Sequence, residues 1–167
     1  MKKLFLALSL GIGLSLGAAA LPAASPESVE AAPGLDKALE KPPFYLETET
    51  GDSPALAKKK AALRLFKEYN VTLNRLNICK ARHPEADKAG AGFGSRNGAT
   101  LNTVILVIRQ TGGLSPDIRE VLNERIALES AAESPACPDL IQAVSQGRRD
   151  LYKASEYAAD YRLVRGR

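Results

Sequence analysis

Apolar residues recur at spacings of three and four in a stretch that begins after Ser53. Their positions are Ala62, Leu65, Tyr69, Thr72, Leu76 and Cys79. This spacing is typical of one buried face of an amphipathic helix. Ser53 and Pro54 provide an N-cap residue and a favoured first helical residue. The pattern predicts a helix from Pro54 to about Arg82, where His83 and Pro84 end it.

Two shorter patterns follow. Residues 85–99 contain four glycines and scattered charges, which indicate a loop. A second helix is expected from near Thr100 to the stop at Gly112 and Gly113. Its centre, residues 104–108, is apolar on all sides and would also suit a buried strand, but the chain offers no second strand to pair with it. Ser115 and Pro116 repeat the earlier start signal and predict a third helix to about Ser134.

The last part of the chain has the clearest periodicity, a four-three alternation over three heptads. Its positions are Leu140, Val144, Gly147, Leu151, Ala154, Ala158 and Tyr161. This alternation predicts one continuous helix from about Pro138. Four helices with short connections predict an all-α, up-and-down four-helix bundle over residues 53–167.

The first 20 residues have the pattern of a secretory signal peptide. Two lysines precede an apolar run over residues 4–16, and Ala18 and Ala20 fit a small-residue cleavage site. The stretch from Leu4 to Leu21 is nearly long enough for the alternative, an uncleaved membrane anchor. Cleavage is favoured by its glycines and serines, and it predicts a periplasmic or secreted protein with no transmembrane span after signal removal.

Residues 21–52 are rich in Pro, Ala and Glu, and they predict a flexible arm. The arm holds seven acidic residues and two lysines, a net charge of −5, whereas residues 53–167 hold 19 basic and 12 acidic residues, a net charge of +7. Residues 42–46 form a short apolar segment that is expected either to dock on the bundle or to bind a partner.

Cys79 and Cys137 are the only cysteines of the chain. In an up-and-down bundle, the end of the first helix and the start of the fourth lie at the same end. Each cysteine also continues the apolar face of its helix. In an exported protein this placement predicts a disulfide. The alternatives are a metal site that adds His83 to the two cysteines, for which no fourth ligand is evident, and free thiols.

Two sets of polar residues are candidate binding sites. Three asparagines on one face of the first helix, with residues of the second helix and the loop before it, predict either a polar groove for a ligand or partner, or a hydrogen-bond network that fixes helix register. This set is Asn70, Asn74, Asn77, Arg96, Asn97, Asn102 and Arg109. The second set is a basic patch expected at the bundle end opposite the cysteines: Lys58, Lys59, Lys60, Arg148, Arg149, Lys153, Arg162 and Arg165.

The glycine-rich loop at residues 90–98 lacks the Lys-Ser/Thr ending of a phosphate-binding loop. The single histidine has no convincing nucleophile partner, and no Ser lies in a G-x-S-x-G turn. No cofactor, metal or nucleic acid is expected, and the basic patch is expected to be solvated or to meet an anionic surface.

The sequence predicts a non-enzymatic protein that acts by protein or envelope interaction, as an adaptor, accessory factor or chaperone. The alternatives are a small-ligand or metal-binding module, and an inhibitor or immunity protein of an envelope-acting enzyme.

Overall fold

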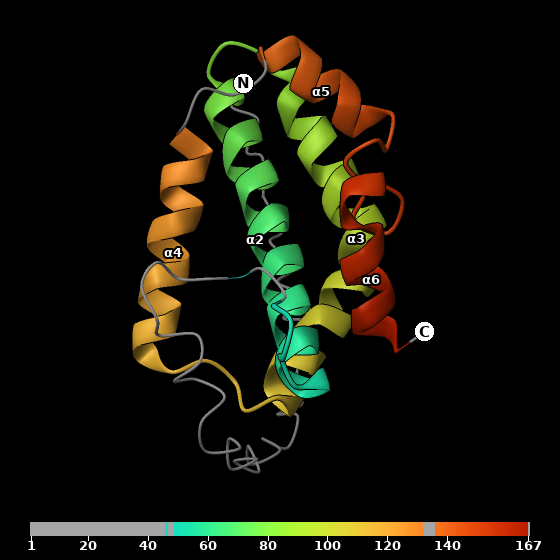
Figure 1. Cartoon of the computed structure of the whole chain (residues 1–167). Helices are drawn as coiled ribbons and strands as arrows, with labels where there is room; N and C mark the ends of the chain where they lie inside the picture. The colour runs from blue at the N-terminus through green and yellow to red at the C-terminus, as the bar shows by residue number, and fades with distance from the viewer. Residues whose placement is uncertain (1–45, 47–48, 132–135, 167) are drawn as a thin grey trace, which may run out of the picture.

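The computed structural model describes residues 46, 49–131 and 136–166. These residues form five α-helices and one 3₁₀ turn, with no strand among them, which confirms the all-α prediction (Figure 1). The elements are α2 (Pro54–Lys80), α3 (Glu85–Gln110), α4 (Pro116–Ala131), α5 (Cys137–Ser145), η1 (Ser155–Tyr157) and α6 (Ala158–Arg165). The predicted signal peptide, most of the arm (21–45 and 47–48) and the expected end of the third helix near Ser134 lie outside the described residues.

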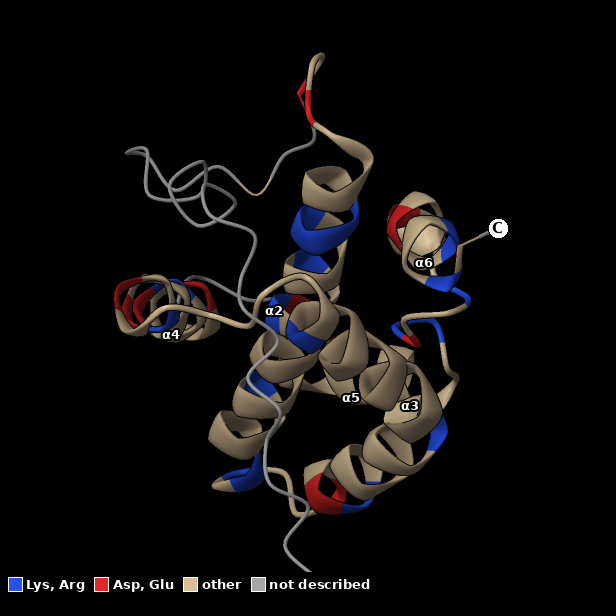
Figure 2. Cartoon of the chain, turned by 90° about the horizontal axis from the view of Figure 1, so that it is seen from below, with Lys and Arg blue, Asp and Glu red and all other residues tan. Residues whose placement is uncertain are grey.

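α2 is the central helix, and α3, α4, α5 and α6 all pack against it. Ser53 Oγ accepts a hydrogen bond from the backbone N–H of Leu56 at 3.2 Å, as the predicted N-cap requires. The predicted apolar face is buried or half-buried along the whole helix. Figure 2 shows α4 on one side of α2, and α3 and α6 on the other.

The loop predicted for residues 85–99 is wrong, because α3 begins at Glu85 and includes the glycines of that stretch. A Cβ atom on Gly90 would lie 3.8 Å from Leu76 Cδ1, which is ordinary van der Waals contact, so this part of α3 packs directly on α2. One turn later, Phe93 is fully buried and stacks on Tyr69 of α2, with the ring centroids 5.4 Å apart. This packing outweighs a helix-propensity cost of about 1 kcal/mol for each glycine.

α4 begins as predicted, since the N–H of Ile118 donates to Ser115 Oγ at 3.3 Å. Ile118, Leu122 and Ile126 are buried in the core that α4 shares with α2 and α3. Leu128 is 72 % exposed on the opposite side of the same helix. Among the described residues, no helix is both long and apolar enough to cross a lipid bilayer.

The predicted continuous fourth helix is wrong, because α5 ends after nine residues and α6 starts only at Ala158. Gly147 has a left-handed φ of +71°, and the N–H of Arg148 donates to the carbonyl of Ala143 at 2.9 Å. These are the features of a Schellman helix stop. Leu151 is still buried, so the apolar pattern marks the core side of the chain although the helix is broken. Two short helices therefore take the place of the predicted fourth helix.

The turn between α5 and η1 is held against α3 by the fully buried carboxylate of Asp150. Its two oxygens accept hydrogen bonds from Arg96 Nε at 3.1 and 3.0 Å. Asn97 Nδ2 donates to Asp150 Oδ1 at 3.2 Å, and Asn97 Oδ1 accepts from the N–H of Leu151 at 2.8 Å. A Cβ atom on Gly147 would lie 2.8 Å from Asp150 Oδ2, so the turn needs glycine there.

Cys79 and Cys137 form the predicted disulfide, with their Cα atoms 5.6 Å apart. The bond joins the last turn of α2 to the first residue of α5. The two sulfurs are bonded to each other and are not thiolate ligands for the alternative metal site. His83 Nδ1 instead lies 3.4 Å from Glu85 Oε1. The described ranges contain no cluster of three or more His, Cys, Asp or Glu side chains that would hold a metal ion.

Candidate functional site

The structure separates the residues of the predicted asparagine groove. Four of them are exposed: Asn74, Asn77, Asn102 and Arg109. Asn70 is half-buried, and its Nδ2 donates to the carbonyl of Phe66 in its own helix at 2.8 Å. Arg96 and Asn97 bind Asp150 instead. The register of α3 against the last part of the chain thus depends on Asp150, and the expected contact of the α2 asparagines with Asn102 is not formed.

The eight predicted basic residues do not share one surface. Lys59 is fully buried, and its Nζ donates to the carbonyl of Thr111 at 3.2 Å. Lys60 is also buried and pairs with Asp52 at 2.9 Å. Lys58 is half-buried on α2, and Lys153, Arg162 and Arg165 are exposed. The last two of the eight, Arg148 and Arg149, lie elsewhere, beside α5.

The Asp52–Lys60 pair predicts a pH dependence of stability. Hydrogen bonds from the N–H of Glu49 and from Lys60 hold the pKa of Asp52 below its ordinary value of 3.8. A lowered folded-state pKa stabilises the fold above the unfolded-state pKa, and this contribution is lost as the pH falls through the folded-state pKa. We expect Asp52→Asn to be less stable than the wild type at neutral pH, and the difference to shrink below pH 3.8. Denaturant unfolding at several pH values measures it; a constant difference would contradict this role of the pair.

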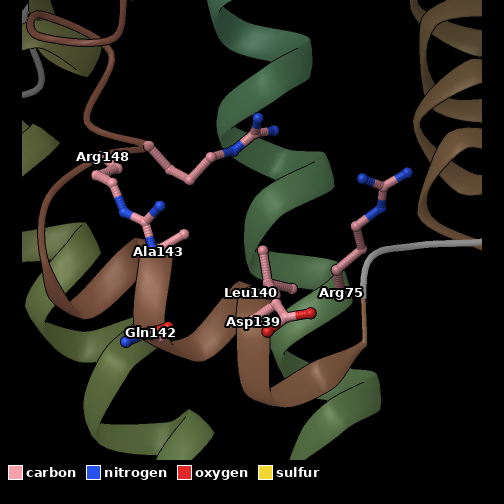
Figure 3. Close-up of a pocket in the computed structure, with 7 residues that line it drawn as sticks. Arg75, Asp139, Leu140, Gln142, Ala143 and Arg148 are labelled. Atoms are coloured by element: carbon pink, nitrogen blue, oxygen red, sulfur yellow. The ribbon is translucent and has the colours of Figure 1, made fainter.

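Arg148 and Arg149 line a cleft of about 430 Å³ between α2 and α5, shown in Figure 3. We name it the arginine cleft, and its lining residues are Arg75, Asp139, Leu140, Gln142, Ala143, Arg148 and Arg149. Figure 3 shows Arg75 on α2 at one side of the cleft and Arg148 at the other, with Asp139 on α5. Arg148 and Arg149 follow the short helix α5, and Arg149 Nη2 lies 3.8 Å from Glu68 Oε2, near the middle of α2.

The surrounding helices position two of the three guanidinium groups. Arg75 Nη2 donates to the carbonyl of Glu129 on α4 at 2.7 Å. Arg149 Nη1 donates to Glu156 Oε1 at 2.7 Å, and its guanidinium carbon lies 5.8 Å from the centre of the Tyr157 ring. The Nε atoms of Arg75 and Arg149 are buried and have no hydrogen-bond partner among the described residues. The two side chains are therefore fixed in place with part of their donor capacity unused.

Tyr157, which contacts Arg149, and Glu129, which contacts Arg75, both have shifted pKa values. Tyr157 donates from its hydroxyl to Glu68 Oε2 at 2.9 Å, and burial, together with the Glu68 charge, raises the pKa of Tyr157. The phenol thus stays protonated at neutral pH. Burial alone would raise the pKa of Glu129, but hydrogen bonds from Lys67 and Arg125 bring that pKa below its ordinary value of 4.5. Glu129 is therefore charged at neutral pH.

Arg148 is exposed and forms no ion pair within the described part of the chain, which leaves its guanidinium open to an anion from outside. Guanidinium groups bind carboxylates and phosphates through two parallel hydrogen bonds. They stay protonated throughout the physiological range, so they bind and orient anions but do not transfer protons. The lining of the cleft therefore contains three arginines and one carboxylate, Asp139, and Arg148 is the arginine that is open to an anionic group.

Sequence reasoning missed Arg75 and Asp139 as site residues. A signal for both was present, because Arg75 lies four residues before Cys79 on the same helix and Asp139 lies two residues after Cys137. A disulfide between the cysteines brings the two helix segments that carry these residues close together. Comparison with known proteins adds no relative: no family model matches this sequence, and neither a curated protein nor a solved structure is significantly similar to it.

Proposed function

We propose that this protein is an exported, non-enzymatic binding protein that recognises an acidic segment of a protein partner through the arginine cleft. It would act as an adaptor, accessory factor or chaperone-like protein. The observation that carries this proposal is that Arg75, Arg148 and Arg149 line one cleft, in which the exposed Arg148 forms no ion pair with the described residues. The volume of about 430 Å³ is in the range of ligand-binding clefts and admits a few side chains of an extended peptide.

The way the cleft is built supports a binding role. Its two walls belong to α2 and to the segment that starts at α5, and the Cys79–Cys137 disulfide ties these walls together. Asp150, which contacts Arg96 on α3, fixes the turn directly after Arg148 and Arg149. A cleft that is held in shape before binding loses less conformational entropy when it takes up a ligand.

The chemistry of the lining residues supports binding in preference to catalysis. Arginine is enriched at the centres of protein interfaces, where it pairs with carboxylates. The disulfide is a bond typical of oxidising compartments, and it agrees with the signal peptide predicted from residues 1–20. Both features favour a partner in the cell envelope or outside the cell.

The test compares three oxidised proteins as baits in envelope extracts: the wild type, Arg148→Glu and Arg162→Glu. Arg148→Glu reverses the charge of a cleft residue, whereas Arg162→Glu makes the same change on the exposed face of α6. We expect a partner retained by the wild type and by Arg162→Glu to bind Arg148→Glu at least about tenfold more weakly. Mass spectrometry identifies the retained proteins, and titration of the purified partner gives the affinities.

Arg148 is exposed, so its substitution should leave the fold intact, and the thermal unfolding midpoints of the three proteins provide that control. Equal retention by all three baits would show that the cleft is not the recognition site. Equal loss of the partner from both variants would instead indicate a diffuse electrostatic attraction without a defined site.

A further inference from the structure

Two tyrosines and two cations form a continuous surface between the turn before η1 and the outer side of α6. Lys153 Nζ lies 5.4 Å from the centre of the Tyr152 ring, and the guanidinium carbon of Arg165 lies 5.5 Å from the centre of the Tyr161 ring. The two rings contact each other in a tilted arrangement, with their centres 6.4 Å apart. We name these four residues the basic tyrosine surface.

The acidic residues of this segment do not neutralise the surface, because each of them pairs with an arginine that lies outside it. The pairs are Asp150 with Arg96, Glu156 with Arg149, and Asp160 with Arg64. Figure 2 shows α6 with Asp or Glu on the side toward α2 and Lys or Arg on the side away from it. Lys153 and Arg165 are exposed and form no ion pair with any described residue. Their positive charges therefore face outward without a counter-charge from the fold.

The tyrosines hold both cations in place. Tyr152 and Tyr161 are half-buried, and the face of an aromatic ring attracts a cation. Arg165 Nη1 also donates to the Tyr161 hydroxyl at 3.0 Å, which leaves most of the N–H groups of this guanidinium free. Side chains that are positioned before binding lose less conformational entropy when they bind an anion.

The arrangement favours one kind of anionic partner, a bilayer surface that presents many phosphate groups. Single-stranded nucleic acids bind through bases that stack on free aromatic faces, whereas both rings here have a cation over them and contact each other. The centre of a protein interface is depleted of charge, whereas two cations cover this surface. Lys and Arg bind anionic headgroups, and Tyr is enriched at the level of the headgroups.

We propose that the basic tyrosine surface binds the headgroups of an anionic phospholipid bilayer. Lys153 and Arg165 bind the lipid phosphates, and Tyr152 and Tyr161 lie at the level of the headgroups. The protein then lies on the membrane without spanning it. None of the four residues lines the arginine cleft, so this surface and the cleft bind their partners independently.

The test measures co-sedimentation of the oxidised protein with vesicles of phosphatidylglycerol and phosphatidylcholine, and with vesicles of phosphatidylcholine alone. Each protein consists of the residues after the predicted cleavage site, so that the apolar run of residues 4–16 does not itself bind the vesicles. This chain keeps every described contact, because the described residues all lie after position 45.

Three proteins are compared: the wild type, Lys153→Gln/Arg165→Gln, and the control Lys88→Gln/Arg119→Gln. The control removes the same charges from exposed positions of α3 and α4. Each cation near an anionic bilayer strengthens binding by about fivefold. We therefore expect Lys153→Gln/Arg165→Gln to bind the anionic vesicles at least about tenfold more weakly than the wild type, and the control to bind them much more tightly than this variant. Thermal unfolding midpoints check that all three proteins are folded.

Equal weakening of both variants would overturn the proposal, because it would show an attraction to the net charge of the protein and no defined surface. Equal binding of the wild type to the two kinds of vesicle, or to neither, would also overturn it. Single-stranded DNA that displaces the wild type from the vesicles, and whose own binding requires Lys153 and Arg165, would assign the surface to nucleic acid instead.

Discussion

Substitution Asp150→Ala is expected to lower the free energy of unfolding by about 3 kcal/mol. The side chain of Asp150 is fully buried and accepts hydrogen bonds from Arg96 and Asn97. Without this carboxylate, the buried Asn97 amide loses a hydrogen-bond acceptor and the Arg96 guanidinium loses its counter-charge. The value is at the low end for a broken buried ion pair, because Arg96 is 32 % exposed and keeps some solvation.

Denaturant unfolding of the oxidised protein measures this effect, with Glu120→Ala on the exposed face of α4 as the control. The control should stay within about 0.5 kcal/mol of the wild type. Asp150→Asn keeps the shape of the side chain and should fall between the two. A near-neutral Asp150→Ala would mean that the turn after α5 does not depend on this carboxylate.

Removal of the disulfide by Cys79→Ser/Cys137→Ser is expected to cost up to about 4 kcal/mol. The two residues are 58 positions apart, and opening such a long loop restores much conformational freedom to the unfolded chain. The bond also ties α5 to α2, so the variant should lose affinity for acidic ligands as well as stability. The measurement is the unfolding midpoint of the variant beside that of the oxidised wild type. Coincident midpoints would show that the bond does not stabilise this fold.

Local signals predicted the parts of the fold that depend on local chemistry. Ser53 and Ser115 were recognisable as helix N-caps, and both accept the expected backbone hydrogen bond. The apolar face of α2 was read directly from its spacing, and it is buried as expected. The Cys79–Cys137 pairing followed from the placement of each cysteine on its apolar face.

The errors occur where tertiary contacts override local preference. The glycines of residues 85–99 were interpreted as a loop, but the stretch is helical and its Phe93 is buried against Tyr69 of α2. The four-three pattern across residues 140–161 was interpreted as one helix, although Gly147 and the buried Asp150 break it. Sequence periodicity shows which residues face the core, but it does not show that the backbone between them stays helical.

The candidate site depends on the same contacts and was only partly predictable. Arg148 and Arg149 were identified as basic surface residues, whereas their meeting with Arg75 depends on where α5 ends. The asparagines of α2 suggested a groove because Asn is a weak helix former. Asn74 and Asn77 are exposed instead, and the buried amide belongs to Asn97, within the residues 85–99 that the sequence had assigned to a loop.

The most direct test of the account is a titration of a labelled peptide of alternating Glu and Gly residues into the oxidised protein. It compares the wild type, Arg148→Glu and Arg162→Glu. The account predicts saturable binding to the wild-type cleft that weakens with added salt, an affinity at least about tenfold lower for Arg148→Glu, and no change for Arg162→Glu. The proposed role of the cleft would be contradicted if Arg148→Glu bound the peptide as tightly as the wild type, or if neither protein bound it.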